Sequence, residues 1–145
     1  MTAELLRESY SIQGRNFDKA GEISSEIKVI LRDLGIEAAY ARRVVIVAFE
    51  AEMNVVMYAD QGTLTLILTD RDISLEIKDE GPGIEDIELA MKEGYSTASD
   101  EMREMGFGFG MGLSNMKKNS DDFYIESEVG KGTQVFAKIR LNSHG

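Results

Sequence analysis

The segment Asp79-Glu80-Gly81-Pro82-Gly83 places a carboxylate directly before two glycines. Apolar and polar residues alternate over residues 72–79, as in a half-buried strand, and Asp79 falls on the apolar face. The other members of that face are Ile73, Leu75 and Ile77. A carboxylate pointing toward a core needs a hydrogen-bond donor from the protein or from a ligand, and bare glycine backbone lets a ligand approach closely. The alternative is an ordinary turn, because Asp, Gly and Pro are frequent turn residues.

A second candidate pair is Glu50 and Asn54, which lie one helical turn apart if residues 37–59 form a helix. The apolar run from Val44 to Phe49 would also fit a buried strand, but the length of the segment and its lack of glycine or proline favour a helix buried on most sides. Tyr58 follows one turn later on the same face. Two polar side chains on a buried helix form either an internally satisfied pair or part of a site.

Glycine occupies every second position from Gly106 to Gly112, and a helix is predicted from about Met111 to Asn119. Glycines at the start of a helix allow backbone N–H groups to converge on an anion, which the helix dipole also favours. Such a loop suits phosphate binding. It would equally suit a flexible linker or a close crossing of two backbones.

The last predicted strand, Thr133 to Leu141, alternates in the same way as the segment before Asp79. Its apolar face consists of Val135, Ala137, Ile139 and Leu141, and Thr133 has the same parity. If the two strands are neighbours, the Asp79 carboxylate and the Thr133 hydroxyl meet and can bind one edge of a heterocycle.

The remaining elements form a framework for these residues. A helix from Asn16 to Leu34, capped by Gly35, has apolar residues at three- and four-residue spacing. The polar segment 95–105 is either a plain loop or a lid between two glycine-rich sites. The other predicted elements are a strand from Leu5 to Ile12, a hairpin of Gly62–Thr69 and Asp72–Asp79 joined at Asp70-Arg71, a short helix from Glu85 to Glu93 ended by Gly94, and a strand from Phe123 to Glu128.

Composition limits the function classes. The 145 residues suit a single domain, 1–145, and a net charge of −10 argues against nucleic acid and anionic membranes as partners. The chain contains no cysteine, and its one histidine, His144, lies in a polar tail that favours a solvated residue over a catalytic base. With no signal peptide and no long apolar run, we expect a cytoplasmic protein.

Together these segments resemble the ATP-binding domain of the GHKL superfamily, which includes gyrase, Hsp90-type chaperones, histidine kinases and MutL-type ATPases. Residues 50–59 resemble its N-box, Asp79-x-Gly81-x-Gly83 its first glycine box, Gly106–Leu113 its second, and Gly132-Thr133 its closing Gly-Thr, all in family order. The resemblance covers about residues 43–141 and implies an α+β two-layer sandwich, with helices on one face of a mixed, mostly antiparallel sheet. No Walker-type Gly-Lys-Ser/Thr is present, which disfavours a P-loop site.

The short length, the run 112–118 and the run 125–133 most resemble bacterial anti-sigma serine kinases and stressosome switch kinases. These bind Mg-ATP and phosphorylate a serine or threonine of a small STAS domain, and some also hold sigma factors. The resemblance implies that Asp79 accepts from the adenine amino group with support from Thr133, that Asn54 ligates Mg²⁺ and that Glu50 is the general base. It implies a lid over about residues 85–110 and nucleotide contacts from Asn54, Asp79, Gly81, Gly83, Ile84, Gly106, Gly108, Gly110, Met111, Gly112, Leu113 and Thr133.

One residue departs from the family pattern. Many relatives have a lysine or arginine one turn past the asparagine, where this chain has Met57. Either Arg103, Lys117 or Lys118 replaces that phosphate contact, or phosphoryl transfer is weak. The hypotheses are therefore a protein serine/threonine kinase acting on a STAS-type partner, an ATP-dependent binding module for a sigma factor or other regulator, and an orphan histidine-kinase catalytic domain. Monomer and homodimer both remain open.

Overall fold

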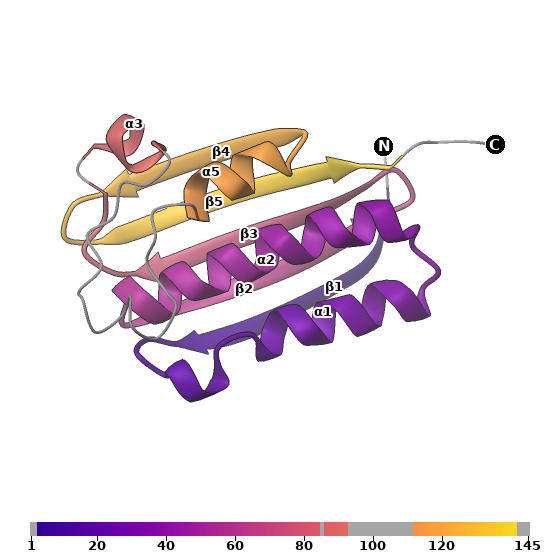
Figure 1. The fold of residues 1–145 in the computed structure, drawn as a ribbon, viewed down its shortest axis with the longest axis horizontal. Coiled ribbons are helices and arrows are strands. Elements are labelled where there is room, and N and C mark those ends of the chain that lie inside the picture. Colours follow the sequence, from indigo (N-terminus) through magenta and orange to yellow (C-terminus); the bar gives the residue numbers. More distant parts are fainter. Residues whose placement is uncertain (1–2, 85, 93–111, 142–145) are drawn as a thin grey trace.

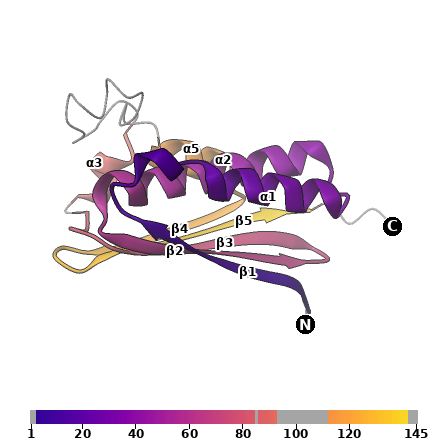
Figure 2. The same cartoon turned by 90° about the horizontal axis from the view of Figure 1, so that it is seen from below.

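The computed structural model describes residues 3–84, 86–92 and 112–141. Helices cover one face of a sheet in these residues, which confirms the expected α+β two-layer sandwich (Figure 1, Figure 2). The elements in chain order are β1 (Glu4–Gln13), the 3₁₀ turn η1 (Phe17–Lys19), α1 (Glu22–Asp33), α2 (Ala38–Tyr58), β2 (Gln61–Thr69), β3 (Asp72–Glu80), α3 (Ile87–Ala90), α5 (Gly112–Lys118), β4 (Asp122–Glu128) and β5 (Gly132–Arg140).

The strand order of the described sheet is β1-β2-β3-β5-β4. All four pairings are antiparallel, whereas the sequence analysis expected some parallel pairing. The reason lies in the connections: α1 and α2 follow each other between β1 and β2, so the chain returns to the end of the sheet where β1 finishes. Since β5 lies between β3 and β4, the end of β3 meets the start of β5, and this brings Asp79 next to Thr133.

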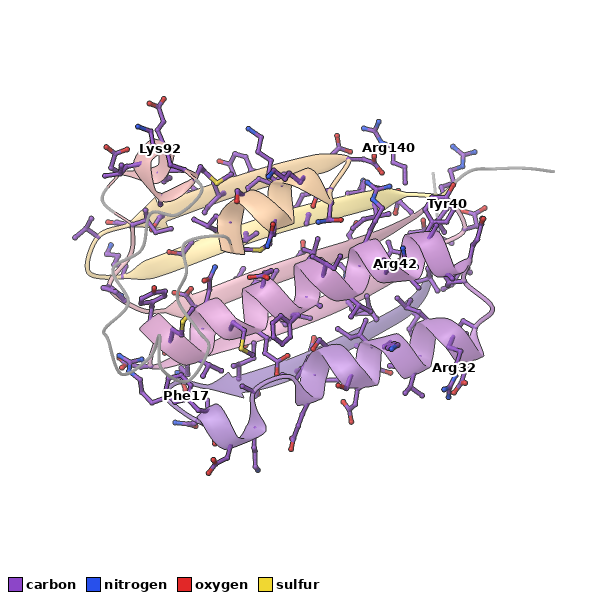
Figure 3. The ribbon with its side chains drawn as sticks, viewed as in Figure 1. Phe17, Arg32, Tyr40, Arg42, Lys92 and Arg140 are labelled. Atoms are coloured by element: carbon purple, nitrogen blue, oxygen red, sulfur yellow. The ribbon has the colours of Figure 1, made fainter. Side chains whose placement is uncertain are left out.

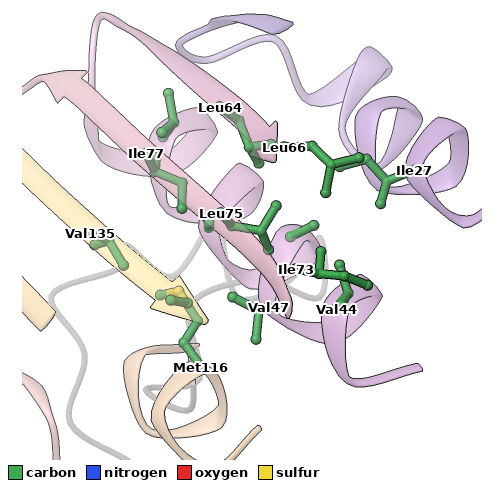
Figure 4. Packing of buried hydrophobic residues seen from close by; sticks show 14 of the residues in the cluster. Ile27, Val44, Val47, Leu64, Leu66, Ile73, Leu75, Ile77, Met116 and Val135 are labelled. Carbon is green, nitrogen blue, oxygen red and sulfur yellow. The ribbon is translucent and has the colours of Figure 1, made fainter. Parts of the chain in front are cut away.

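The core lies between the sheet and the helices. Alternate residues of the central strands point toward α2, as the period-two pattern predicted, and Met116 of α5 closes the core at one side (Figure 4). The fully buried members include Ile27, Leu31, Val44, Val47, Leu64, Leu66, Ile73, Leu75, Met116 and Ile139. The segment from Val44 to Phe49 is helical, which confirms the prediction for α2.

The start of the first helix differs from the prediction. Instead of one helix from Asn16, the chain forms the short η1 turn and then begins α1 at Glu22, after Gly21. The cause is Glu52 of α2, a buried residue that is 2% exposed. Its carboxylate accepts hydrogen bonds from the backbone N–H groups of Gly21 (3.0 Å), Ile23 (3.3 Å) and Ser24 (3.2 Å). These are N–H groups that a helix start leaves without intrahelical partners, so a side chain from α2 caps α1.

We expect the substitution Glu52→Gln to destabilise the fold. The glutamine oxygen can accept some of the same N–H groups but lacks the charge that strengthens these bonds, and its amide hydrogens face donors. The expected loss is about 1–2 kcal/mol, which lowers Tm by roughly 3–8 °C in a protein of this size. Thermal unfolding followed by circular dichroism measures this, and an unchanged Tm would remove Glu52 as the cap of α1.

Apart from α3, the other element boundaries are close to the predictions. α1 ends at Asp33, and the N–H groups of Gly35 and Ile36 bond back to the Arg32 and Leu31 carbonyls, as a glycine-type C-terminal cap requires. Within the predicted 85–93 helix, the described residues form only the four-residue α3, capped at its start by Asp86. In the described part of the chain, no helix is long and apolar enough to cross a membrane.

Candidate functional site

A cavity of about 910 Å³ lies among α2, α3, α5 and the adjoining ends of β3 and β5. It is at the end of the sheet marked by Phe17 and Lys92 in Figure 3, and Arg32 and Arg140 lie at the opposite end. The predicted site residues that line it are Asn54, Asp79, Gly83, Ile84, Leu113 and Thr133. A second hollow, of about 1240 Å³, shares Asp79, Ser127 and Thr133 with it, so these three residues border both.

Asp79 is half-buried and extends the inward face of β3, as its parity predicted. Its Oδ1 accepts a hydrogen bond of 3.1 Å from the backbone N–H of Thr133. Burial raises the pKa of the Asp79 carboxyl, and this hydrogen bond opposes the rise. Among the described residues the side chain hydrogen-bonds through Oδ1, which leaves Oδ2 to accept from a ligand.

The prediction that the Asp79 carboxylate meets the Thr133 hydroxyl is wrong. The strands are neighbours, but the contact uses the Thr133 backbone N–H, because the two residues lie where the β3–β5 pairing ends. The hydroxyl is instead 2.9 Å from Oγ of Ser127 on β4. Thr133 nevertheless lines the cavity together with Asp79.

The first glycine segment packs against the β4–β5 turn. Gly83 has φ of 77°, a backbone conformation that favours glycine, and a Cβ there would collide with the Glu128 carbonyl. Pro82 accepts a hydrogen bond of 2.8 Å from the Gly130 N–H, and the Ile84 N–H donates to Ser127 Oγ at 2.7 Å. These contacts fix the chain just past Asp79 along one wall of the cavity.

Glu50 and Asn54 share one face of α2, and both lie against the start of α5. A Cβ built on Gly112 would be 3.2 Å from Glu50 Oε2 and 3.4 Å from Asn54 Oδ1, so the lack of a side chain lets the start of α5 approach these two oxygens closely. Asn115 of α5 donates from Nδ2 to Glu50 Oε1 at 3.4 Å. The arrangement places a carboxylate and an amide oxygen at the site where the second glycine segment enters its helix.

Burial raises the pKa of Glu50, and the hydrogen bond from Asn115 opposes that rise. A carboxylate with a raised pKa is a stronger proton acceptor once it is ionised, and this is the property required of a general base near neutral pH. The geometry therefore places a carboxylate at Glu50 and an amide oxygen at Asn54, groups of the types that can accept a proton and bind a metal ion.

Several predicted site residues lie outside the described residues: Gly106, Gly108, Gly110, Met111, the alternative phosphate contact Arg103, most of the expected lid over 85–110, and His144. Among the described candidates to replace the missing basic residue, Lys117 and Lys118 are exposed in the last turn of α5. They are therefore about one and a half helical turns from Gly112. Met57 itself is 7% exposed and packs in the protein interior.

Two residues that contact the site were missed by the sequence analysis. Ser127 lies on the inward face of β4 with Phe123 and Ile125, opposite Thr133 in the β4–β5 pairing. Its parity in the strand was the one feature of the sequence that could have identified it as a site residue. Asn115 lies one turn into α5, but only the packing of α5 on α2 brings it to Glu50. The sequence alone gave no register between those helices.

Comparisons with known proteins find a matching sequence family and similar single proteins. The sequence pattern of the histidine kinase-, DNA gyrase B- and HSP90-like ATPase family (HATPase_c) matches residues 39–143. The anti-sigma F factor of Clostridium acetobutylicum is 36% identical over 97 residues, which are 63% of this chain and 64% of that protein. The serine/threonine-protein kinase RsbT of Bacillus subtilis (strain 168) is 30% identical over 112 residues, 74% of this chain and 78% of that protein.

A second anti-sigma F factor, from Caldanaerobacter subterraneus subsp. tengcongensis, is 36% identical over 91 residues, which are 59% of this chain and 60% of that protein. The chain thus spans slightly less than two thirds of the length of the two anti-sigma F factors. Its match to the serine/threonine-protein kinase extends over more than three quarters of that protein.

Proposed function

The chain belongs to the histidine kinase-, DNA gyrase B- and HSP90-like ATPase family, and from that premise we propose that it binds Mg-ATP and transfers the γ-phosphate to a serine or threonine of a small STAS-type partner protein. The observation behind this proposal is the placement of Glu50 and Asn54 against the bare Cα of Gly112, with Asn54 also lining the cavity that Asp79 lines. The name of the related serine/threonine-protein kinase supports the choice of reaction.

The cavity fits an adenine nucleotide in chemistry as well as size. Asp79 Oδ2 can accept a hydrogen bond from the adenine amino group, while Oδ1 remains bonded to Thr133. Apolar side chains of Ile77, Leu113 and Val135 line the same cavity and suit the faces of a purine ring. A volume of about 910 Å³ is within the usual range for a small-molecule site.

The residues present also fit a magnesium ion. Mg²⁺ prefers oxygen ligands and is held in phosphate-transfer sites by one or two protein oxygens together with phosphates and water. Asn54 Oδ1, in front of Gly112, is such an oxygen. Asn54 would hold the ion there, and the ion would supply positive charge that neutralises the phosphates.

We expect Asn54→Ala to weaken ATP binding chiefly when Mg²⁺ is present. The variant loses the metal ligand but keeps the base-binding contacts of Asp79, so affinity in EDTA should change little, whereas affinity in Mg²⁺ should fall about tenfold or more. Calorimetric titration of ATP in both buffers measures this. Asn119→Ala is the matched control, because that amide binds the Asn115 carbonyl outside the cavity. An equal loss with and without Mg²⁺ would contradict the ligand role.

In the proposed transfer step, the hydroxyl oxygen of the partner's serine or threonine forms a bond to the γ-phosphorus while the bond from that phosphorus to the β–γ bridging oxygen breaks and ADP leaves. Glu50 accepts the hydroxyl proton. Asn115 holds the Glu50 carboxylate in place through its Nδ2. The experiment that tests the function is transfer of labelled γ-phosphate to a co-encoded STAS protein, with the modified residue mapped by mass spectrometry.

A second candidate function is an ATP-dependent binding module for a sigma factor. Two observations favour it: two of the relatives are named anti-sigma F factors, and Met57 is buried where many family members have a basic residue. Stable co-purification with a sigma factor without phosphate transfer would select this function over the kinase. Transfer without sigma binding would select the kinase.

A further inference from the structure

Ser127 connects two walls of the cavity through hydrogen bonds, although it is not among the predicted site residues. Its Oγ accepts the Ile84 N–H at 2.7 Å, lies 3.1 Å from the Gly132 carbonyl and lies 2.9 Å from Thr133 Oγ1. The side chain therefore connects the chain that follows Asp79 to the first two residues of β5. It is partly buried and borders the cavity.

These three contacts use the whole hydrogen-bonding capacity of one hydroxyl, which has one proton to donate and two lone pairs to accept with. The Ile84 N–H can only donate, and the Gly132 carbonyl can only accept. Ser127 thus gives its proton to Gly132 and accepts from Ile84, so its second lone pair accepts the proton of Thr133. With its proton committed to Ser127, the Thr133 hydroxyl offers only lone pairs to the cavity.

We propose that Ser127 makes Thr133 an acceptor toward the bound base and so selects purines with an amino group at position 6 over purines with a carbonyl there. This inference rests on the proposed nucleotide site. An acceptor at Thr133, next to the acceptor Asp79, matches an amino donor, whereas a carbonyl oxygen would face lone pairs from both residues. Ser127 reaches the base through its contact with Thr133, so it acts as a specificity-determining residue.

The test compares ATP with ITP, in which a carbonyl replaces the amino group at position 6 of the purine and N1 carries a hydrogen. In Ser127→Ala, the Thr133 proton is released from its partner and can donate to the carbonyl of ITP. We expect the ratio of ATP affinity to ITP affinity to fall about tenfold, which is the effect of one hydrogen bond in a buried site. Displacement of a fluorescent ATP analogue by each nucleotide measures the two affinities, with Tm recorded on the same preparations.

A double-mutant cycle separates this role from a merely structural one. Thr133→Val keeps the backbone N–H that binds Asp79 but has no hydroxyl to be oriented. In that background, Ser127→Ala should leave the ATP-to-ITP ratio unchanged, although it can still lower both affinities through the lost Ile84 contact. Ser120→Ala is the matched control: its hydroxyl donates to the Met116 carbonyl in α5 and does not border the cavity, so the ratio should stay at the wild-type value.

Each possible result either supports or overturns the specificity role of Ser127. Equal weakening of ATP and ITP in Ser127→Ala would overturn the specificity role and leave only a structural tie. If Ser127→Ala lowered the ratio of ATP affinity to ITP affinity in the Thr133→Val background as well, Ser127 would act by another route, which also overturns the inference. If Ser127→Ala does not fold, Ser127→Cys takes its place, because a thiol is a weak donor and acceptor of similar shape. Wild-type protein that binds neither nucleotide would contradict the proposed function itself, a result distinct from all of these.

Discussion

Replacing Asp79 with asparagine is expected to lower ATP affinity about ten- to a hundredfold, while the ligand-free protein becomes slightly more resistant to heat. The structure fixes how the new amide is oriented. The Thr133 N–H donates to Oδ1 of Asp79, so the asparagine keeps its oxygen at that position and turns its NH₂ group to where Oδ2 was. A donor then faces the adenine amino group, and an unmatched pair of buried donors costs about 1–3 kcal/mol.

The stability effect follows from the sign of the pKa shift. Burial raises the pKa of Asp79, so the folded protein binds that proton more tightly than the unfolded chain does. The stabilising contribution of the protonated form is present below the ordinary aspartate range and is lost as pH rises through the raised folded value. At neutral pH the ionised carboxylate is therefore a net cost in the ligand-free fold, and a neutral asparagine removes it.

Calorimetry and thermal unfolding on the same preparation test both parts. Asp72→Asn is the control on the same strand, because Asp72 pairs with Thr69 and Lys138 at the other end of β3 and should leave ATP affinity unchanged. A folded Asp79→Asn protein with wild-type ATP affinity would exclude Asp79 as the residue that recognises the base.

Sequence reasoning was most successful where local periodicity determines structure. The alternation before Asp79 and from Thr133 onward predicted both strands and their inward faces, and the uninterrupted length of residues 37–59 predicted α2. Four motifs in family order also predicted the fold, because each motif occurs on a particular element. Helical spacing predicted that Glu50 and Asn54 share one face of α2, whereas their position against α5 came only from the structure.

These failures involve contacts between different structural elements, whether distant in sequence or, as for Ser127 and Thr133, only six residues apart. The start of α1 at Glu22 depends on the Glu52 carboxylate, and no local rule places that side chain against Gly21. The Thr133 hydroxyl turns to Ser127 because β4 supplies a hydroxyl in register, whereas the prediction considered only the Asp79 carboxylate as its partner. Strand pattern gives the face of a side chain, but the donor it meets depends on register and on which strand lies alongside.

Replacing Glu50 with glutamine is expected to abolish most phosphate transfer, by about 100- to 10,000-fold, with ATP still bound within a few-fold of wild type. Glutamine preserves the size of the side chain and can still hydrogen-bond Asn115, but it cannot take the proton of the attacking hydroxyl. If Glu50 were only a structural hydrogen-bond partner, the variant would lose thermal stability instead. Tm, ATP affinity and transfer rate on one preparation separate the two roles.

The pH dependence of transfer gives an independent signature. The base works when it is ionised, so the rate should rise with pH through the pKa of Glu50, which burial raises above the ordinary glutamate value. Asn115 donates to that carboxylate and thereby lowers its pKa. Asn115→Ala should therefore move the acid side of the pH–rate profile to higher pH, and Glu50→Gln should remove that side altogether.

The sharpest control for Glu50 is Glu52, which lies two residues away on the same helix but points its carboxylate at the start of α1. The same Glu→Gln change there should lower Tm and leave transfer by the folded protein near the wild-type rate. Glu50→Gln should instead leave Tm unchanged or raise it and should abolish transfer. The half-buried Glu50 carboxylate is destabilised by desolvation, whereas the Glu52 carboxylate is stabilised by three N–H donors. If both variants had a lower Tm, and if the transfer rate of each fell in proportion to its loss of stability, the two carboxylates would share a structural role. A stable, ATP-binding Glu50→Gln protein that transferred phosphate at the wild-type rate would exclude Glu50 from the mechanism.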